Sequence, residues 1–170
     1  VVYHHHMGTV IQTEDEIDHL ISETKDLGLL FDTGHLIYAG ISPQSIIDKH
    51  FLRIRHCHLK NVRFPVLNRV IQEKRSFPEA ILEGVFTVSG DNGYDNDHGF
   101  DFFSIVRTLV EKKYHGWIIM EAEQDPTLAN PLDYASLGYH HLNYLLSKSL
   151  LTVKGKYNAS SKRNECCAVI

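Results

Sequence analysis

The chain has 170 residues, of which 43% are hydrophobic and 22% are charged, a composition typical of a folded globular domain and not of a disordered segment. A formal net charge of −4 gives no broad basic surface, which excludes nucleic acid as the expected partner. No apolar run approaches the ~20 residues that span a bilayer, no secretory leader pattern is visible, and three cysteines do not form a disulfide framework. These features predict a cytoplasmic protein.

Four short apolar runs, rich in β-branched or aromatic residues, predict buried strands at residues 1–3, 28–31, 54–59 and 117–120. Helical patterns lie between these runs. The first helix is predicted to begin after Thr13, which forms a capping-box pattern with Glu16. Alternation of buried strands with helices predicts an α/β fold with a parallel sheet and helical crossovers. Further helices are expected from Ser42-Pro43, over residues 102–113, and from Pro131.

The segment 63–100 departs from this alternation because it is too long for a simple connection between a strand and a helix. It contains helical patterns at residues 66–74 and 77–83, followed by a turn-rich stretch at 89–99. A long insertion after the carboxyl end of a strand usually covers or lines a site. We therefore expect this segment to lie beside the functional site.

Each predicted strand ends in polar residues or is followed directly by them. Parallel strands present their carboxyl ends at one common edge, where barrel active sites lie, and alternate residues of a strand point the same way. His4 and His6, His56 and His58, and Glu121 and Glu123 are therefore expected to share directions in pairs. Imidazoles and carboxylates that converge on one point suit a divalent cation. The four sets are His4-His5-His6, Asp32-Thr33-Gly34-His35, His56-Cys57-His58-Leu59-Lys60 and Glu121-Ala122-Glu123.

Each set has a simpler explanation. The histidine run could be a remnant of a tag, Asp32 could cap a helix or form a turn, and His56 or His58 could be a hydrogen-bonded core histidine. Glu121 ends an apolar strand, where an unpaired carboxylate is costly, so it needs a partner from the protein or a metal. Polar residues of these kinds at four successive strand ends are difficult to explain by chance, which favours a metal or catalytic site.

Five ordered stretches carry a resemblance to a known family: YHHHMGT, FDTGH, HCHLKNVR, GVFT before a Gly-Asp turn, and MEAEQDP. Over about residues 1–146 they resemble the inosose (2-keto-myo-inositol) dehydratases of the xylose-isomerase-like barrel superfamily. The resemblance implies a (β/α)₈ TIM barrel, which takes about 250 residues. Residues 1–150 would then be its C-terminal half, about strands five to eight. A missing N-terminal half barrel or a homo-oligomer would complete it.

The resemblance also implies a set of metal ligands. Asp32, His58 and Glu121 match the family's Asp, His and final Glu ligands, and His4 stands where sugar epimerases have a glutamate. The implied cofactor is a divalent metal, Mn²⁺ or Co²⁺ first, with glutathione as a further candidate. The implied catalytic residues are Glu121, His35 and Lys60, and the implied substrate-binding residues are His6, His35, Lys60, Arg63 and Glu123.

The implied reaction is dehydration of 2-keto-myo-inositol (scyllo-inosose), a cyclic polyol ketone, to a trihydroxycyclohexane-dione in inositol catabolism. The cation would polarise the ketone, a general base would remove a neighbouring proton, and an acid would help the β-hydroxyl leave as water. A ketose epimerase or isomerase of the same superfamily is the alternative within this fold. An inactive fragment that acts as a lipid-anchored interaction module is the alternative from another class.

The C-terminal segment 151–170 is basic and polar, which predicts a flexible tail. It ends in Cys166-Cys167-Ala168-Val169-Ile170, and its last four residues have the form of a prenylation box. Isoleucine is not among the usual final residues, so we favour a chance match. A membrane is therefore a partner only if Cys167 is prenylated.

Overall fold

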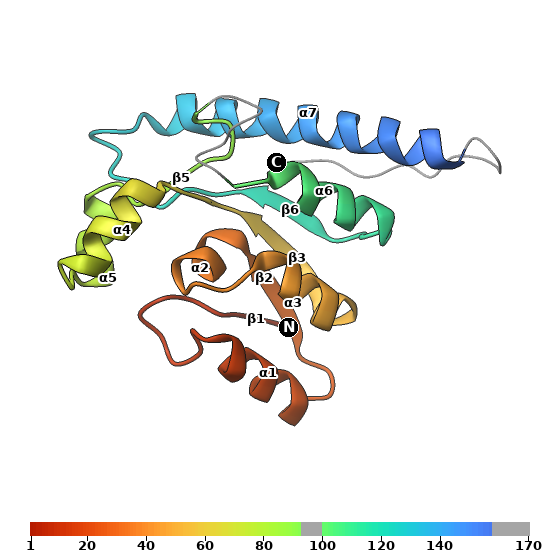
Figure 1. Ribbon diagram of the computed structural model, residues 1–170, viewed down its shortest axis with the longest axis horizontal. Helices are drawn as coiled ribbons and strands as arrows, with labels where there is room; N and C mark the ends of the chain where they lie inside the picture. Colours follow the sequence, from red (N-terminus) through yellow and green to blue (C-terminus); the bar gives the residue numbers. More distant parts are fainter. Residues whose placement is uncertain (93–99, 158–170) are drawn as a thin grey trace.

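A four-stranded parallel sheet forms the centre of the computed structural model, which describes residues 1–92 and 100–157 and gives the backbone alone for 154–157 (Figure 1). The strands are β1 (Val2–His4), β2 (Gly28–Asp32), β3 (Ile54–Leu59) and β6 (Trp117–Met120), in the spatial order β1-β2-β3-β6. All three pairings are parallel. The α/β fold with a parallel sheet and helical crossovers is confirmed. Its two edge strands are β1 and β6.

Helices connect each pair of neighbouring strands, as parallel pairing requires. In Figure 1, α1 lies at the β1 end of the molecule, whereas α6 and α7 lie together at the β6 end. The helices are α1 (Glu14–Glu23), α2 (Thr33–Tyr38), α3 (Pro43–His50), the short 3-10 helix η1 (Phe51–Arg53), α4 (Phe64–Gln72), α5 (Phe77–Leu82), α6 (Phe102–Glu111) and α7 (Pro131–Tyr157).

The start of α1 shows how the sequence sets a local boundary. The Glu16 backbone N–H donates to Thr13 Oγ1 at 3.4 Å, and the Thr13 N–H donates to Glu16 Oε2 at 2.8 Å. This reciprocal pair is the predicted capping box. It satisfies donors that have no partner inside the helix.

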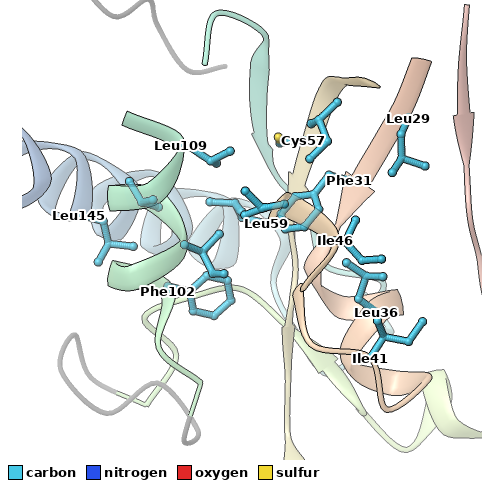
Figure 2. Packing of buried hydrophobic residues seen from close by; sticks show 14 of the residues in the cluster. Leu29, Phe31, Leu36, Ile41, Ile46, Cys57, Leu59, Phe102, Leu109 and Leu145 are labelled. Carbon is cyan, nitrogen blue, oxygen red and sulfur yellow. The ribbon is translucent and has the colours of Figure 1, made fainter. Parts of the chain in front are cut away.

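Strand alternation divides the sheet into an apolar face and a polar face. Leu29 and Phe31 of β2, with Cys57 and Leu59 of β3, pack into the main core against side chains of α2, α3, α6 and α7 (Figure 2). On the opposite face Leu30 pairs with His56 and Asp32 pairs with His58. The sheet thus packs Leu29, Phe31, Cys57 and Leu59 against the helices and places His56, His58 and Asp32, together with Leu30, on the other side.

The long segment after β3 contains structure that local patterns only partly indicate. Helices α4 and α5 were expected, but β4 (Asn61–Val62) and β5 (Phe86–Thr87) were not. These two strands pair antiparallel, Asn61 with Thr87 and Val62 with Phe86. With α4 and α5 they enclose a second, smaller core that includes Val62, Leu67 and Phe86. The end of the turn-rich stretch, residues 93–99, lies outside the described residues.

Helix α7 continues to Tyr157, past the boundary expected at residue 150. The predicted prenylation box lies outside the described residues. Within residues 1–92 and 100–157, no helix is both long and apolar enough to cross a bilayer.

Candidate metal and substrate site

The two carboxylate oxygens of Asp32 have different contacts. Its Oδ1 accepts hydrogen bonds from the backbone N–H groups of Gly34 at 2.9 Å and His35 at 3.1 Å. The residue therefore caps α2, which is the simpler of the two explanations that the sequence allowed for Asp32. The cap fixes the side chain so that Oδ2 faces the other strand ends.

A first group of possible metal ligands surrounds Asp32 Oδ2 at the carboxyl ends of β1, β2 and β3. His4 Nε2 lies 3.3 Å from this oxygen and His58 Nδ1 lies 3.5 Å from it. Ligand atoms bound to one ion at about 2.0–2.2 Å are separated by roughly 3 Å, so these distances match shared coordination. The three side chains form one of two groups among the described residues that could hold an ion.

Glu121 lies beside this first group. Its Oε2 is 2.7 Å from His58 Nδ1, yet both atoms are buried without a well-oriented hydrogen bond among the residues that the structure describes. Buried polar atoms normally have a partner. Both atoms have ionic neighbours, since His58 Nδ1 lies 3.5 Å from Asp32 Oδ2 and Glu121 Oε2 lies 3.1 Å from Lys60 Nζ. A bound cation would coordinate them as well, so this donor set fits a divalent metal.

A second group lies next to the first and consists of His6, His35 and Glu123. His6 Nε2 is 3.5 Å from Glu123 Oε1, and His35 Nε2 is 3.4 Å from Glu123 Oε2. The rings of His6 and His35 are tilted against each other with centroids 3.8 Å apart. His4 and His6 therefore contribute to different groups, although strand alternation predicts a shared direction.

Lys60 lies between the two groups and its side chain is fully buried. Its Nζ is 2.7 Å from Glu123 Oε2, 3.1 Å from Glu121 Oε2 and 3.5 Å from Asp32 Oδ2. It also lies 3.1 Å from His35 Nε2. A buried ammonium requires such partners, because an unpaired charge in the interior is strongly unfavourable.

The start of α2 holds Lys60 in this position. Thr33 Oγ1 donates to the Lys60 carbonyl at 2.7 Å and accepts from the Lys60 N–H at 2.9 Å. Gly34 lies against the Lys60 stem, and a β-carbon at Gly34 would be only 2.6 Å from Lys60 Cγ and Cδ. The lysine position thus depends on two neighbours that sequence reasoning did not single out.

The electrostatics of the site follow from burial opposed by charge pairing. Burial disfavours the ionised form of Asp32, but contacts with His4 and His58 and the Lys60 charge hold its pKa well below the ordinary value. Burial also opposes ionisation of Glu121, while His58 and Lys60 lower its pKa. Burial alone would lower the pKa of His58, yet the carboxylates of Asp32 and Glu121 raise it to about 9.

His35 differs from His58 because burial dominates. Burial lowers the pKa of His35 to about 2, despite the nearby Asp32 carboxylate, so the ring is neutral. Burial alone would lower the pKa of Lys60, but the neighbouring carboxylates raise it, and Asp32 contributes most among them. The lysine therefore remains an ammonium at neutral pH and donates hydrogen bonds.

Two residues behave differently from the sequence expectations. Arg63 donates to Asp91 at 2.7 Å and to the carbonyls of Gly84 and Phe86, and within the described part of the chain it contacts neither ligand group. His5 had no expected function but is buried, with both ring nitrogens lacking a hydrogen-bond partner among the described residues. Burial lowers the pKa of His5 to about 4.

Comparison with known proteins connects this geometry to a family. A family profile described as a xylose isomerase-like TIM barrel matches residues 1–143. The chain belongs to the xylose isomerase-like TIM-barrel family. Membership agrees with the parallel βα arrangement and with a polar site at the carboxyl ends of the strands.

Individual relatives are similar over most of this chain. The inosose dehydratase of Clostridium beijerinckii is 52% identical over 137 residues, 79% of this chain and 44% of that protein. The inosose dehydratase of Geobacillus thermodenitrificans is 50% identical over 137 residues, with the same coverage of each chain. The rhizopine catabolism protein MocC of Rhizobium meliloti is 45% identical over 143 residues, 84% of this chain and 42% of that protein. The chain therefore spans less than half the length of these relatives.

Proposed function

We propose that this chain carries the catalytic strand ends of an inosose dehydratase, which removes water from 2-keto-myo-inositol to give a trihydroxycyclohexane-dione. The observation that carries the proposal is the convergence of His4, Asp32, His58 and Glu121 beside a buried Lys60. Similarity to inosose dehydratases at 42–52% identity supports the choice of substrate.

We propose that His4, Asp32, His58 and Glu121 hold one divalent metal, Mn²⁺ or Co²⁺. The mixed set of imidazole and carboxylate ligands suits either ion. When bound, the ion supplies Lewis acidity that polarises a ketone oxygen. Asp32 is well suited as a ligand because its other oxygen is already anchored by the α2 cap.

The protein groups account for the proton transfers of an elimination. Glu121 removes the proton from the carbon next to the ketone, and the electron pair of that C–H bond forms the enolate. The C=O bond then re-forms while the C–O bond to the β-hydroxyl breaks, and Lys60 donates the proton that makes the leaving group water. The new C=C bond carries the α-hydroxyl, so this product is an enol, and its tautomerisation gives the dione. Glu121 Oε2 and Lys60 Nζ are 3.1 Å apart, so the captured proton can return to the lysine after each turnover.

We assign substrate orientation to the second group. The neutral ring of His35 and the His6 ring can hydrogen-bond the hydroxyls of a cyclic polyol, and Glu123 can accept from them. Arg63 remains a proposed substrate residue on the resemblance alone. Its described contacts place its guanidinium against Asp91.

We also propose that these four strands are strands five to eight of the barrel. The relatives are about twice as long as the matched region, which leaves room for four further βα units. Such units, in the same chain or in another, would pair with the edge strands β1 and β6. Activity is therefore expected of the assembled barrel.

Product analysis tests the proposal. The assembled protein is incubated with 2-keto-myo-inositol, with and without metal and with and without glutathione, and products are identified by mass spectrometry. Loss of one water to give the dione is the expected result, and His58→Ala is expected to abolish it. An epimerised ketose without loss of water would support the isomerase alternative, and no metal-dependent turnover would favour the interaction-module alternative.

A further inference from the structure

We propose that the Lys60 ammonium takes the place of a second metal ion in the His6–His35–Glu123 group, so that the site combines one metal with one fixed lysine. The inference rests on the proposed metal at the first group. It concerns the second group, which the proposed function uses to orient the substrate and not to bind an ion.

His6 has the hydrogen-bonding pattern of a metal ligand. Its Nδ1 lies 2.7 Å from the Met7 carbonyl oxygen, which can only accept, so Nδ1 carries the proton. In the neutral ring the lone pair then lies on Nε2, which is 3.5 Å from Glu123 Oε1. Metal-bound histidines typically donate the other ring N–H to a backbone carbonyl or carboxylate in this way.

His35 offers its lone pair to the same place. Lys60 Nζ can only donate and lies 3.1 Å from His35 Nε2, so this nitrogen accepts. The Met7 N–H approaches Nδ1 of His35 at 3.4 Å and is the longer, weaker contact. Two imidazole lone pairs and the Glu123 carboxylate thus surround a position in which a positive charge is favourable.

The ammonium already supplies that charge. Lys60 Nζ is within 3.1 Å of both His35 Nε2 and Glu123 Oε2. Its side chain is fully buried, and the Thr33 hydrogen bonds and the close approach of Gly34 fix its backbone and stem. A divalent ion in the same group would lie a few ångströms from this ammonium, where like charges repel strongly. The lysine therefore excludes a second ion.

The consequence is a site with two different cationic centres. A metal polarises an oxygen but carries no proton, whereas an ammonium can give one to a leaving hydroxyl. Elimination of water needs both functions. A pair of metal ions would provide the first function twice and would leave the second to solvent.

Metal stoichiometry tests the inference without reference to activity. The purified protein and its Lys60→Met variant are saturated with Mn²⁺, and bound ions are counted by plasma mass spectrometry and by calorimetric titration. Lys60→Met keeps most of the stem but removes the charge, and we expect it to bind one more ion per chain than the unaltered protein. Lys60→Arg keeps the charge and should bind no additional ion. Lys60→Met combined with Glu123→Gln should lose the additional ion.

An equal number of bound ions in the unaltered protein and in folded Lys60→Met would overturn the inference. Two ions per chain in the unaltered protein would also overturn it, and that measurement needs no variant. Folding of each variant is checked by its thermal melting transition. Absence of any ion from the unaltered protein would instead contradict the first metal group and the proposed function. The difference between Lys60→Met and the unaltered protein would still decide the role of the lysine.

Discussion

Replacing Gly34 by alanine tests whether the position of Lys60 matters for turnover. The new β-carbon would be 2.6 Å from Lys60 Cγ and Cδ and 2.8 Å from its Cβ, whereas ordinary contact begins at 3.4 Å. The lysine stem must therefore move by about 0.8 Å, and Thr33 restrains its backbone. Misplacement of a catalytic group by about 1 Å can lower turnover by about 10²-fold. We expect a loss of that size in kcat.

The stability effect should be modest by comparison. Overpacking of a filled interior costs about 1–3 kcal/mol, so Gly34→Ala should lower the melting temperature without preventing folding. Gly40→Ala is the matched control. Its β-carbon would meet nothing within 4 Å, but its φ of +75° makes alanine unfavourable by about 1–2 kcal/mol. That variant should lose stability and keep kcat. The reasoning would be refuted if folded Gly34→Ala retained kcat within about twofold of the unaltered protein.

Three further predictions concern the metal, the second group and the sheet edges. A chelator should abolish turnover and Mn²⁺ or Co²⁺ should restore it, whereas Glu121→Gln should remain at least ~10²-fold slower at saturating metal, because the base is lost; full activity of metal-free Glu121→Gln would contradict the mechanism. His35→Gln should raise KM and lower kcat with metal content unchanged, since His35 belongs to the second group and not to the first. Loss of the metal from this variant would count against the separation of the two groups. The isolated chain should associate in sedimentation experiments because β1 and β6 are unpaired edges and Trp117 is 53% exposed; a compact monomer that unfolds cooperatively would disagree.

The main strands were predictable because each is a short apolar run with a sharp polar end. The β3 and β6 boundaries agree with the predicted runs, and the capping box located α1. Helix α2 was missed because it has six residues, includes Gly34, and has almost no solvent-facing side to produce a periodic pattern. The β4–β5 pair was missed because each strand has two residues and its pairing is non-local.

The candidate site was predictable as a collection of residues but not as two groups. Alternation holds only inside a strand, and β1 ends at His4, so the direction of His6 is set by the following turn. The same applies to Glu123, which lies beyond the end of β6. Burial of Lys60 depends on the packing of Thr33 and Gly34, which are distant from it in sequence. The expectation that Glu121 needs a partner was correct, because His58 and Lys60 adjoin it.

The central claim is that the strand ends form one metal centre at His4, Asp32, His58 and Glu121. Anomalous diffraction at the cobalt edge from crystals of the assembled protein grown with Co²⁺ tests this claim most directly. The account predicts a single strong peak within about 2.0–2.3 Å of His4 Nε2, Asp32 Oδ2, His58 Nδ1 and a Glu121 carboxylate oxygen. A peak between His6, His35 and Glu123 instead, or no peak near either group at saturating Co²⁺, would contradict it.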